Sequence, residues 1–130
     1  MISLNNYRNA KEVESLFSKL FEVRQVSHQM HLQTDSYAIH KALNSFYNKL
    51  LDLADSLIET FQGQYGIVQK YEIQNINVSK DEVLNYLEES VKLVLIGHKA
   101  FSETDTHLHN IVDEIVALFY STIYKIKHLK

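Results

Sequence analysis

The stretch GQYGIVQKYEIQNINV, residues 63–78, decides between the folds open to this chain. It carries two of the chain's three glycines and little of the three- and four-residue spacing of apolar side chains that surrounds it. On both sides of it that helical spacing is sustained, and the chain contains no proline. We therefore predict an all-α protein in which residues 63–78 form a long connection.

Two helices are predicted before this connection. The first should run from about Tyr7 to Gln33 and the second from about Asp35 to Gln62, with a short turn between them. Thr34 or Asp35 is the expected N-cap of the second helix, because a side-chain oxygen at that position can accept from a free backbone N–H.

Two more helices are predicted after the connection. Ser79–Glu82 has the pattern of a capping box and should open a third helix that ends near Phe101. Thr104 or Asp105 should cap a fourth, whose inward stripe comprises Leu108, Ile111, Val112, Ile115, Leu118, Phe119, Ile123 and Ile126. Four amphipathic helices predict a four-helix bundle.

The length of the connection predicts how the four helices are joined. Neighbouring antiparallel helices usually need about two to eight residues between them, whereas this segment has sixteen. A second helix of about 28 residues is about 42 Å long, and sixteen extended residues reach about 55 Å, enough to return along the bundle. Hairpin, long crossover and hairpin is the ferritin-like order. We expect residues 1–130 to form one such domain.

Composition limits the partners of the protein. Sixteen acidic against thirteen basic side chains argue against a general phosphate-binding surface. Without cysteine, a metal would need His, Asp or Glu ligands, a set that favours harder metals including iron. The polar start of the chain and the absence of a long apolar run predict a cytoplasmic protein with no membrane segment.

Histidines flank the first predicted turn. His28 lies six residues before Thr34 and His40 six residues after it, so a hairpin would place the two imidazoles at one level as half of a metal site. His31, one turn from His28, competes for that role. Any single helical histidine is more often solvated or hydrogen-bonded, which is also our expectation for His98, His107 and His109.

Carboxylates follow farther along the second helix. Asp52, Asp55 and Glu59 share one acidic face, usually a solvated one, and Asp55 and Glu59 have the spacing of a ligand pair. The fifteen residues from His40 to Asp55 span about 22 Å of helix, so these groups of one chain cannot bind one ion. Either they are unrelated, or two chains meet about a twofold axis and each supplies half of two identical sites.

The intervals between four of these residues resemble those of a known family. His28, a second histidine twelve residues later at His40, Asp55 fifteen residues on and Glu59 four beyond match the Dps-like miniferritins, the DNA-protection proteins of starved cells. The resemblance implies a ferroxidase site made by the histidines of one subunit and the carboxylates of its twofold mate. It also implies Fe(II) as substrate, peroxide or oxygen as oxidant, and a twelve-subunit shell that stores ferric iron.

Departures from the family leave a second hypothesis open. Asn44 stands where the family usually has an aspartate four residues after the second histidine. Loss of an anionic ligand favours the alternative of a non-catalytic ferritin-like scaffold with a decayed metal site. DNA binding, which family members achieve with lysine-rich tails, is weakly indicated, since only Arg8 and Lys11 are basic among the first eleven residues.

Overall fold

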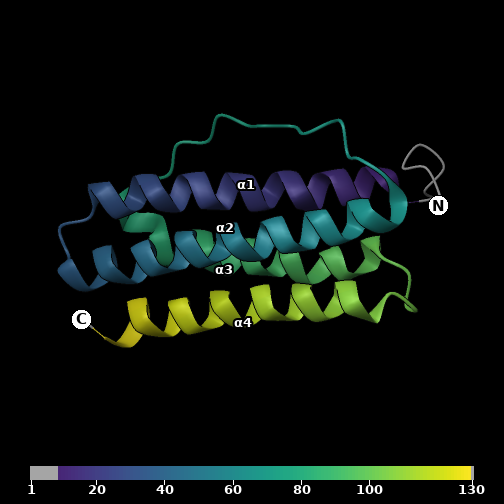
Figure 1. Ribbon diagram of the computed structural model, residues 1–130. Coiled ribbons are helices and arrows are strands. Elements are labelled where there is room, and N and C mark those ends of the chain that lie inside the picture. The colour runs from purple at the N-terminus through teal and green to yellow at the C-terminus, as the bar shows by residue number, and fades with distance from the viewer. Residues whose placement is uncertain (1–8, 130) are drawn as a thin grey trace.

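The structure, a computed structural model, describes residues 9–129 and confirms the all-α, four-helix prediction. Within this range there is no strand. The predicted helix start at Tyr7 lies outside the described residues. The long helices, with the short 3-10 helices η2 and η3 on either side of α3, are α1 (Ala10–Gln33), α2 (Tyr37–Tyr65), η2 (Lys80–Glu82), α3 (Val83–Ile96), η3 (Gly97–Ala100) and α4 (Thr106–His128) (Figure 1).

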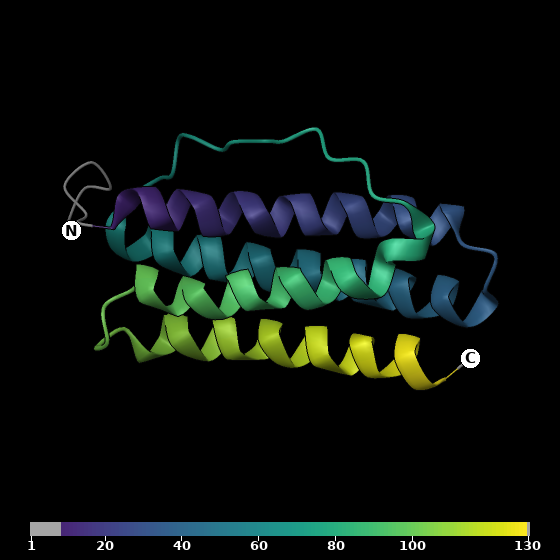
Figure 2. The same ribbon diagram turned by 180° about the vertical axis from the view of Figure 1, so that it is seen from behind.

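The four helices pack as a bundle with the predicted connections. α1 packs against α2 and α3, and α4 packs against the same two helices. Short turns join α1 to α2 and α3 to α4 at opposite ends of the bundle, while residues 66–79 return along the outside of α1 (Figures 1 and 2). Hairpin, long crossover and hairpin is therefore the observed order.

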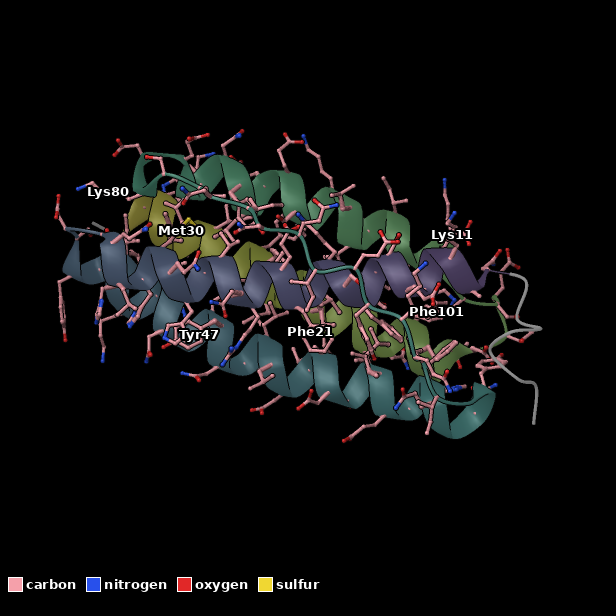
Figure 3. All side chains as sticks on the ribbon, turned by 90° about the horizontal axis from the view of Figure 1, so that it is seen from above. Lys11, Phe21, Met30, Tyr47, Lys80 and Phe101 are labelled. Carbon is pink, nitrogen blue, oxygen red and sulfur yellow. The ribbon has the colours of Figure 1, made fainter. Side chains whose placement is uncertain are left out.

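The crossover is held on α1 by specific contacts. Glu72 N donates to Ser18 Oγ at 3.0 Å, and the Tyr71 ring meets Phe21 edge to face at 5.3 Å. Figure 3 shows the crossover passing over α1 near Phe21. The crossover begins later than predicted, because α2 continues past Gly63 and ends at Gly66, whose φ of 107° glycine adopts readily.

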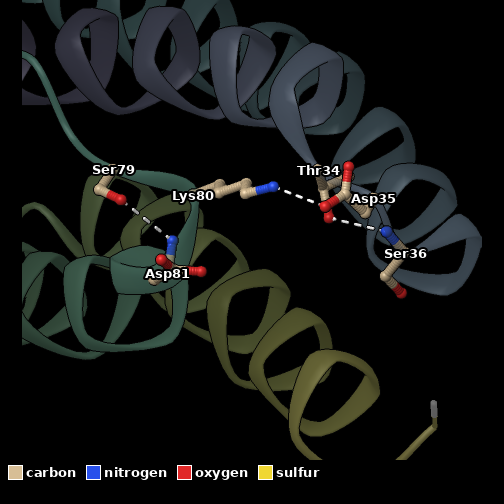
Figure 4. A network of polar contacts seen from close by, with 6 residues as sticks. All are labelled: Thr34, Asp35, Ser36, Ser79, Lys80 and Asp81. Carbon is tan, nitrogen blue, oxygen red and sulfur yellow. Dashed lines mark hydrogen bonds and ion pairs between the residues drawn. The ribbon is translucent and has the colours of Figure 1, made fainter.

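The α1–α2 turn is capped by a different residue from either one predicted. Ser36 is the N-cap of α2, and its Oγ accepts from Ile39 N at 3.2 Å. Thr34 Oγ1 instead accepts from Ser36 N inside the turn, and Asp35 pairs with Lys80 at 2.5 Å (Figure 4). This ion pair ties the turn to the start of α3.

The caps of the second hairpin also depart from prediction. Ser79 Oγ accepts from Asp81 N at 3.4 Å, but the residues after it form η2 before α3 begins. Asp105 occupies the N-cap of α4 without a capping hydrogen bond from its side chain. Its buried carboxylate accepts instead from Tyr65 Oη and from Gln64 Nε2, which joins the end of α2 to the start of α4.

The apolar stripes of the helices meet in one core. Its largest side chains are fully enclosed, and each stabilises the fold by about 1.5–3 kcal/mol relative to exposure. None of the helices within residues 9–129 is long and apolar enough to cross a membrane. The largest aromatic members of this core are Phe17, Phe46, Phe61 and Phe119.

Candidate metal-binding site

His31 and His40 face each other across the α1–α2 turn. Their rings stack with centroids 3.8 Å apart and planes 20° from parallel. Nδ1 of each ring lies 2.8 Å from the backbone oxygen of the other residue. A carbonyl oxygen only accepts, so each Nδ1 carries the hydrogen and donates it. A neutral ring has one N–H, which leaves both Nε2 atoms with a free lone pair.

The helix ends explain this reciprocal pairing. His31 lies in the last turn of α1, where backbone carbonyls have no intrahelical donor, and the Nδ1–H of His40 supplies one. The turn spans residues 34–36, so His31 and His40 are placed almost symmetrically about it. His28 is one helical turn too far from the centre to be the residue that meets His40.

His28 continues the cluster one turn down α1. Its ring stacks on Tyr47 of α2 with centroids 4.4 Å apart, and it lies 6.0 Å from His31. Tyr47 also meets His31 edge to face at 5.4 Å, and its hydroxyl donates to Asn44 Oδ1 at 2.9 Å. We call His28, His31 and His40 the histidine row. The predicted residues His28 and His40 both belong to it, with His31 between them.

The predicted carboxylates lie elsewhere on α2. Asp55 and Glu59 are exposed, like Asp52, and make no ion pair within residues 9–129. The fifteen residues from His40 to Asp55 put about 22 Å of helix between them. Among the described residues of a single chain, no three His, Cys, Asp or Glu side chains are grouped so as to hold a metal ion.

A second histidine pair lies at the opposite end of the bundle. His98 of η3 and His109 of α4 bring their Nδ1 atoms to 2.7 Å. The sequence did not predict this pair, although the two residues are nearly symmetric about the connection between η3 and α4. His107 is separate from it and donates from Nε2 to Gln64 Oε1 at 2.8 Å.

Between the two ends, α1 and α3 are clamped by a polar network. Tyr86 Oη donates to Glu22 Oε2 at 2.7 Å, and Lys19 Nζ pairs with the same oxygen at 2.6 Å. Burial raises the pKa of the Tyr86 phenol, and the hydrogen bond to the Glu22 carboxylate raises it further.

Comparison with known proteins places the chain in a family. The family of unknown function DUF5856 matches residues 31–126. The chain belongs to this family. An uncharacterized 14.6 kDa protein from the mobD-ri intergenic region of Enterobacteria phage T4 is 24% identical over 97 residues, 75% of this chain and 73% of the phage protein. No solved structure gives a significant match. The DUF5856 region begins at His31, so it contains both histidine pairs and the carboxylates but leaves His28 outside.

Proposed function

We propose that this DUF5856 protein is a Dps-like, iron-binding protein that oxidises Fe(II) at sites shared between two copies of the chain. Nitrogen ligands come from the histidine row of one copy, and oxygen ligands come from Asp55 and Glu59 of the other. In the peroxide reaction, two Fe(II) ions each give up one electron, and one hydrogen peroxide takes both electrons and two protons to become two waters. Ferric iron would then collect inside a shell of twelve subunits.

The observation that carries the proposal is the reciprocal bonding of His31 and His40. Metal-bound histidines commonly donate their other ring N–H to a carbonyl or carboxylate, which fixes the tautomer and orients the ligating nitrogen. Both rings have this arrangement, with Nδ1 donating at 2.8 Å and Nε2 left with its lone pair. The turn therefore holds nitrogen donors ready for a metal.

The position of the carboxylates supports a site that needs a second chain. Asp55 and Glu59 are exposed and spaced to act together, but about 22 Å of helix separates Asp55 from His40. An antiparallel pair of α2 helices about a twofold axis would bring the histidine row of each copy toward the carboxylates of the other. Such a dimer contains two equivalent sites.

Complementation between variants tests the sharing of ligands. Anaerobic Fe(II) titration should show loss of binding in His40→Gln alone and in Asp55→Asn alone. When the two variants are co-expressed with different tags, each mixed dimer keeps one site in which both contributors are intact. Purified mixed dimers should therefore regain half of the wild-type Fe(II) sites and of the peroxide-dependent oxidation.

A matched carboxylate provides the control. Asp52→Asn removes the same charge from the same exposed face but should leave Fe(II) binding within about twofold, since surface charges contribute little at this distance. Unchanged Fe(II) binding in both His40→Gln and Asp55→Asn would contradict the proposal. Loss in both without recovery in the mixed dimer would contradict the shared site.

Asn44 favours a second candidate function, a non-catalytic assembly protein built on the same bundle. Its Oδ1 accepts from Tyr47 Oη, so the residue in place of the family's aspartate has a structural partner. A neutral amide is a weaker ligand than a carboxylate for a hard cation. Native mass measurement separates the two: a twelve-subunit particle that oxidises Fe(II) supports the miniferritin, and a dimer or another symmetry without oxidation supports the scaffold.

A further inference from the structure

His98 and His109 meet edge to edge rather than face to face. Their ring planes are 14° from parallel, but their Nδ1 atoms, 2.7 Å apart, are far closer than their centroids at 4.9 Å. Two unprotonated nitrogens at this distance would point lone pairs at each other. A hydrogen between them turns the contact into an N–H···N hydrogen bond of ordinary length.

The outer nitrogens of both rings are also committed as donors. His109 Nε2 lies 3.0 Å from the backbone oxygen of Ser102, which only accepts. His98 Nε2 lies 2.9 Å from Asp113 Oδ1, which accepts when the carboxylate is ionised. Each Nε2 therefore carries a hydrogen of its own.

Counting hydrogens gives the pair a charge. Two neutral histidines bring two ring protons, and both are used at the Nε2 atoms of His98 and His109. The Nδ1···Nδ1 bond needs a third. We propose that His98 and His109 hold one shared proton as a singly charged imidazole–imidazolium pair, which makes the connection between η3 and α4 a proton-dependent latch.

The surroundings suit one positive charge. Asp113 faces His98 from α4, and the ring of Phe101 packs edge-on against His109 at 6.1 Å. α1 meets η3 through the uncharged Leu16 and Asn9, and α2 reaches this end through Gln64 and Tyr65, which bind Asp105. The remaining ionisable side chains of η3, the connection and the first turn of α4 are Lys99, Glu103, Asp105 and His107.

A proton fits the space better than a metal ion. Two histidine nitrogens bound to one tetrahedral zinc lie roughly 3.3 Å apart, given bonds of about 2.0–2.1 Å. The Nδ1 atoms of His98 and His109 are closer than that, at 2.7 Å. Binding a metal between them would require the rings to separate and to lose the proton.

The latch should close only within a window of pH. Above the window the shared proton leaves, and two lone pairs face each other. Below it a fourth proton binds, and two N–H groups face each other. The folded pair thus holds more protons than the unfolded chain at high pH and fewer at low pH, so its contribution to stability peaks near the ordinary titration range of histidine, about pH 6.5.

Nitrogen NMR of the wild-type protein tests the proton count directly. In chelator-treated protein at about pH 6.5, both Nε2 atoms should have protonated ring-nitrogen shifts. The two Nδ1 atoms should have shifts between the protonated and unprotonated values, with a ring hydrogen slow to exchange. Two ordinary unprotonated Nδ1 shifts would overturn the proposal, and so would signals that change on removal of metal.

Unfolding experiments test the latch. Between about pH 4.5 and 8.5, a range centred on ordinary histidine, the stability of the wild type relative to His98→Gln should follow a bell with its maximum near the centre. At the maximum the folded-to-unfolded ratio should differ by about tenfold, as for a hydrogen bond to a charged group. His107→Gln, two residues from His109 and outside the pair, should show no bell. A flat or steadily rising difference would overturn the latch, and the NMR result decides if His98→Gln fails to fold.

Discussion

The two turns of the bundle each bring two histidines together, but with opposite consequences for their nitrogens. At the α1–α2 turn, His31 and His40 stack face to face and each donates from Nδ1 to the other's backbone. At the other end, His98 and His109 meet edge to edge through Nδ1 and use both Nε2 atoms as donors. Tyr47 and Phe101, which pack against these pairs, lie toward opposite ends of the bundle in Figure 3.

The difference teaches that a histidine pair is defined by its acceptors. Backbone oxygens take one hydrogen from each ring in the first pair, which leaves two neutral rings with two lone pairs. In the second pair His98 and His109 are each other's partners, so three hydrogens fill four nitrogens and no lone pair is left over. The first pair is prepared for a metal and the second for a proton.

Truncation of Phe101 should have the largest effect and should act at one end. Phe101 is 4% exposed, and its ring packs against Phe61 at 5.8 Å and against His109. Phe101→Ala should cost about 3–4 kcal/mol, from lost burial and the cavity left behind. Chemical unfolding measures the cost, and nitrogen NMR should show that the His98–His109 hydrogen bond is lost while the His31 and His40 signals persist.

A core phenylalanine nearer the other end is the control. Phe119 is fully buried and packs edge-on against Phe46 at 5.0 Å, so Phe119→Ala should cost a similar amount. It should leave the His98–His109 bond intact. If both truncations abolished that bond equally, the two turns would not be independent and the comparison would fail.

Zinc binding should separate the two pairs by at least about tenfold in apparent affinity. At neutral pH a metal finds lone pairs on His31 and His40, whereas at His98 and His109 it must first displace a proton and break hydrogen bonds. Zn(II) titration followed by ring-nitrogen shifts should move the first pair at low Zn(II) and the second only at excess. Simultaneous movement of both pairs would remove the distinction between them.

Tyr86→Phe should destabilise the protein by about 1 kcal/mol without altering either turn. The change removes a hydrogen bond to the Glu22 carboxylate, which keeps Lys19 as a partner. Because the folded protein raises the pKa of Tyr86, its contribution is complete below the unfolded value of about 10 and is lost as pH rises above that. Unfolding of both proteins between about pH 7 and 11 should show the difference shrinking only at the alkaline end. A difference that grows with pH would contradict this assignment.

The sequence predicted the architecture well because the fold depends on periodic patterns and on lengths. Apolar spacing placed all four helices, and the length of residues 63–78 predicted the crossover. Helix ends were less accurate, since a cap depends on a single hydrogen bond. Ser36 captured Ile39 N although Thr34 and Asp35 were equally suitable by residue type, because Asp35 had a more distant partner in Lys80.

The site was predicted only in part for a related reason. The sequence placed His28 and His40 at one end of the bundle, but the position of the turn decided that His31 would meet His40. The meeting of His98 with His109 also depended on where a turn falls, and single-residue symmetry about a turn is a weak signal without the structure. The pairing of Asp55 and Glu59 with a second chain remains a prediction.

Removal of the ion pair beside the first turn should have the smallest effect. Lys80 lowers the pKa of Asp35 through a hydrogen bond and its charge, so the pair contributes above the unfolded value of about 4 and is lost as pH falls below it. The Asp35 side chain is 89% exposed, and surface pairs are screened by salt. Asp35→Asn should therefore shift the thermal midpoint barely at neutral pH and not at all near pH 3. If Asp35→Asn instead disturbed the ring-nitrogen signals of His31 and His40, the turn would depend on its link to α3, and the reciprocal hydrogen bonds would not suffice to orient the histidine row.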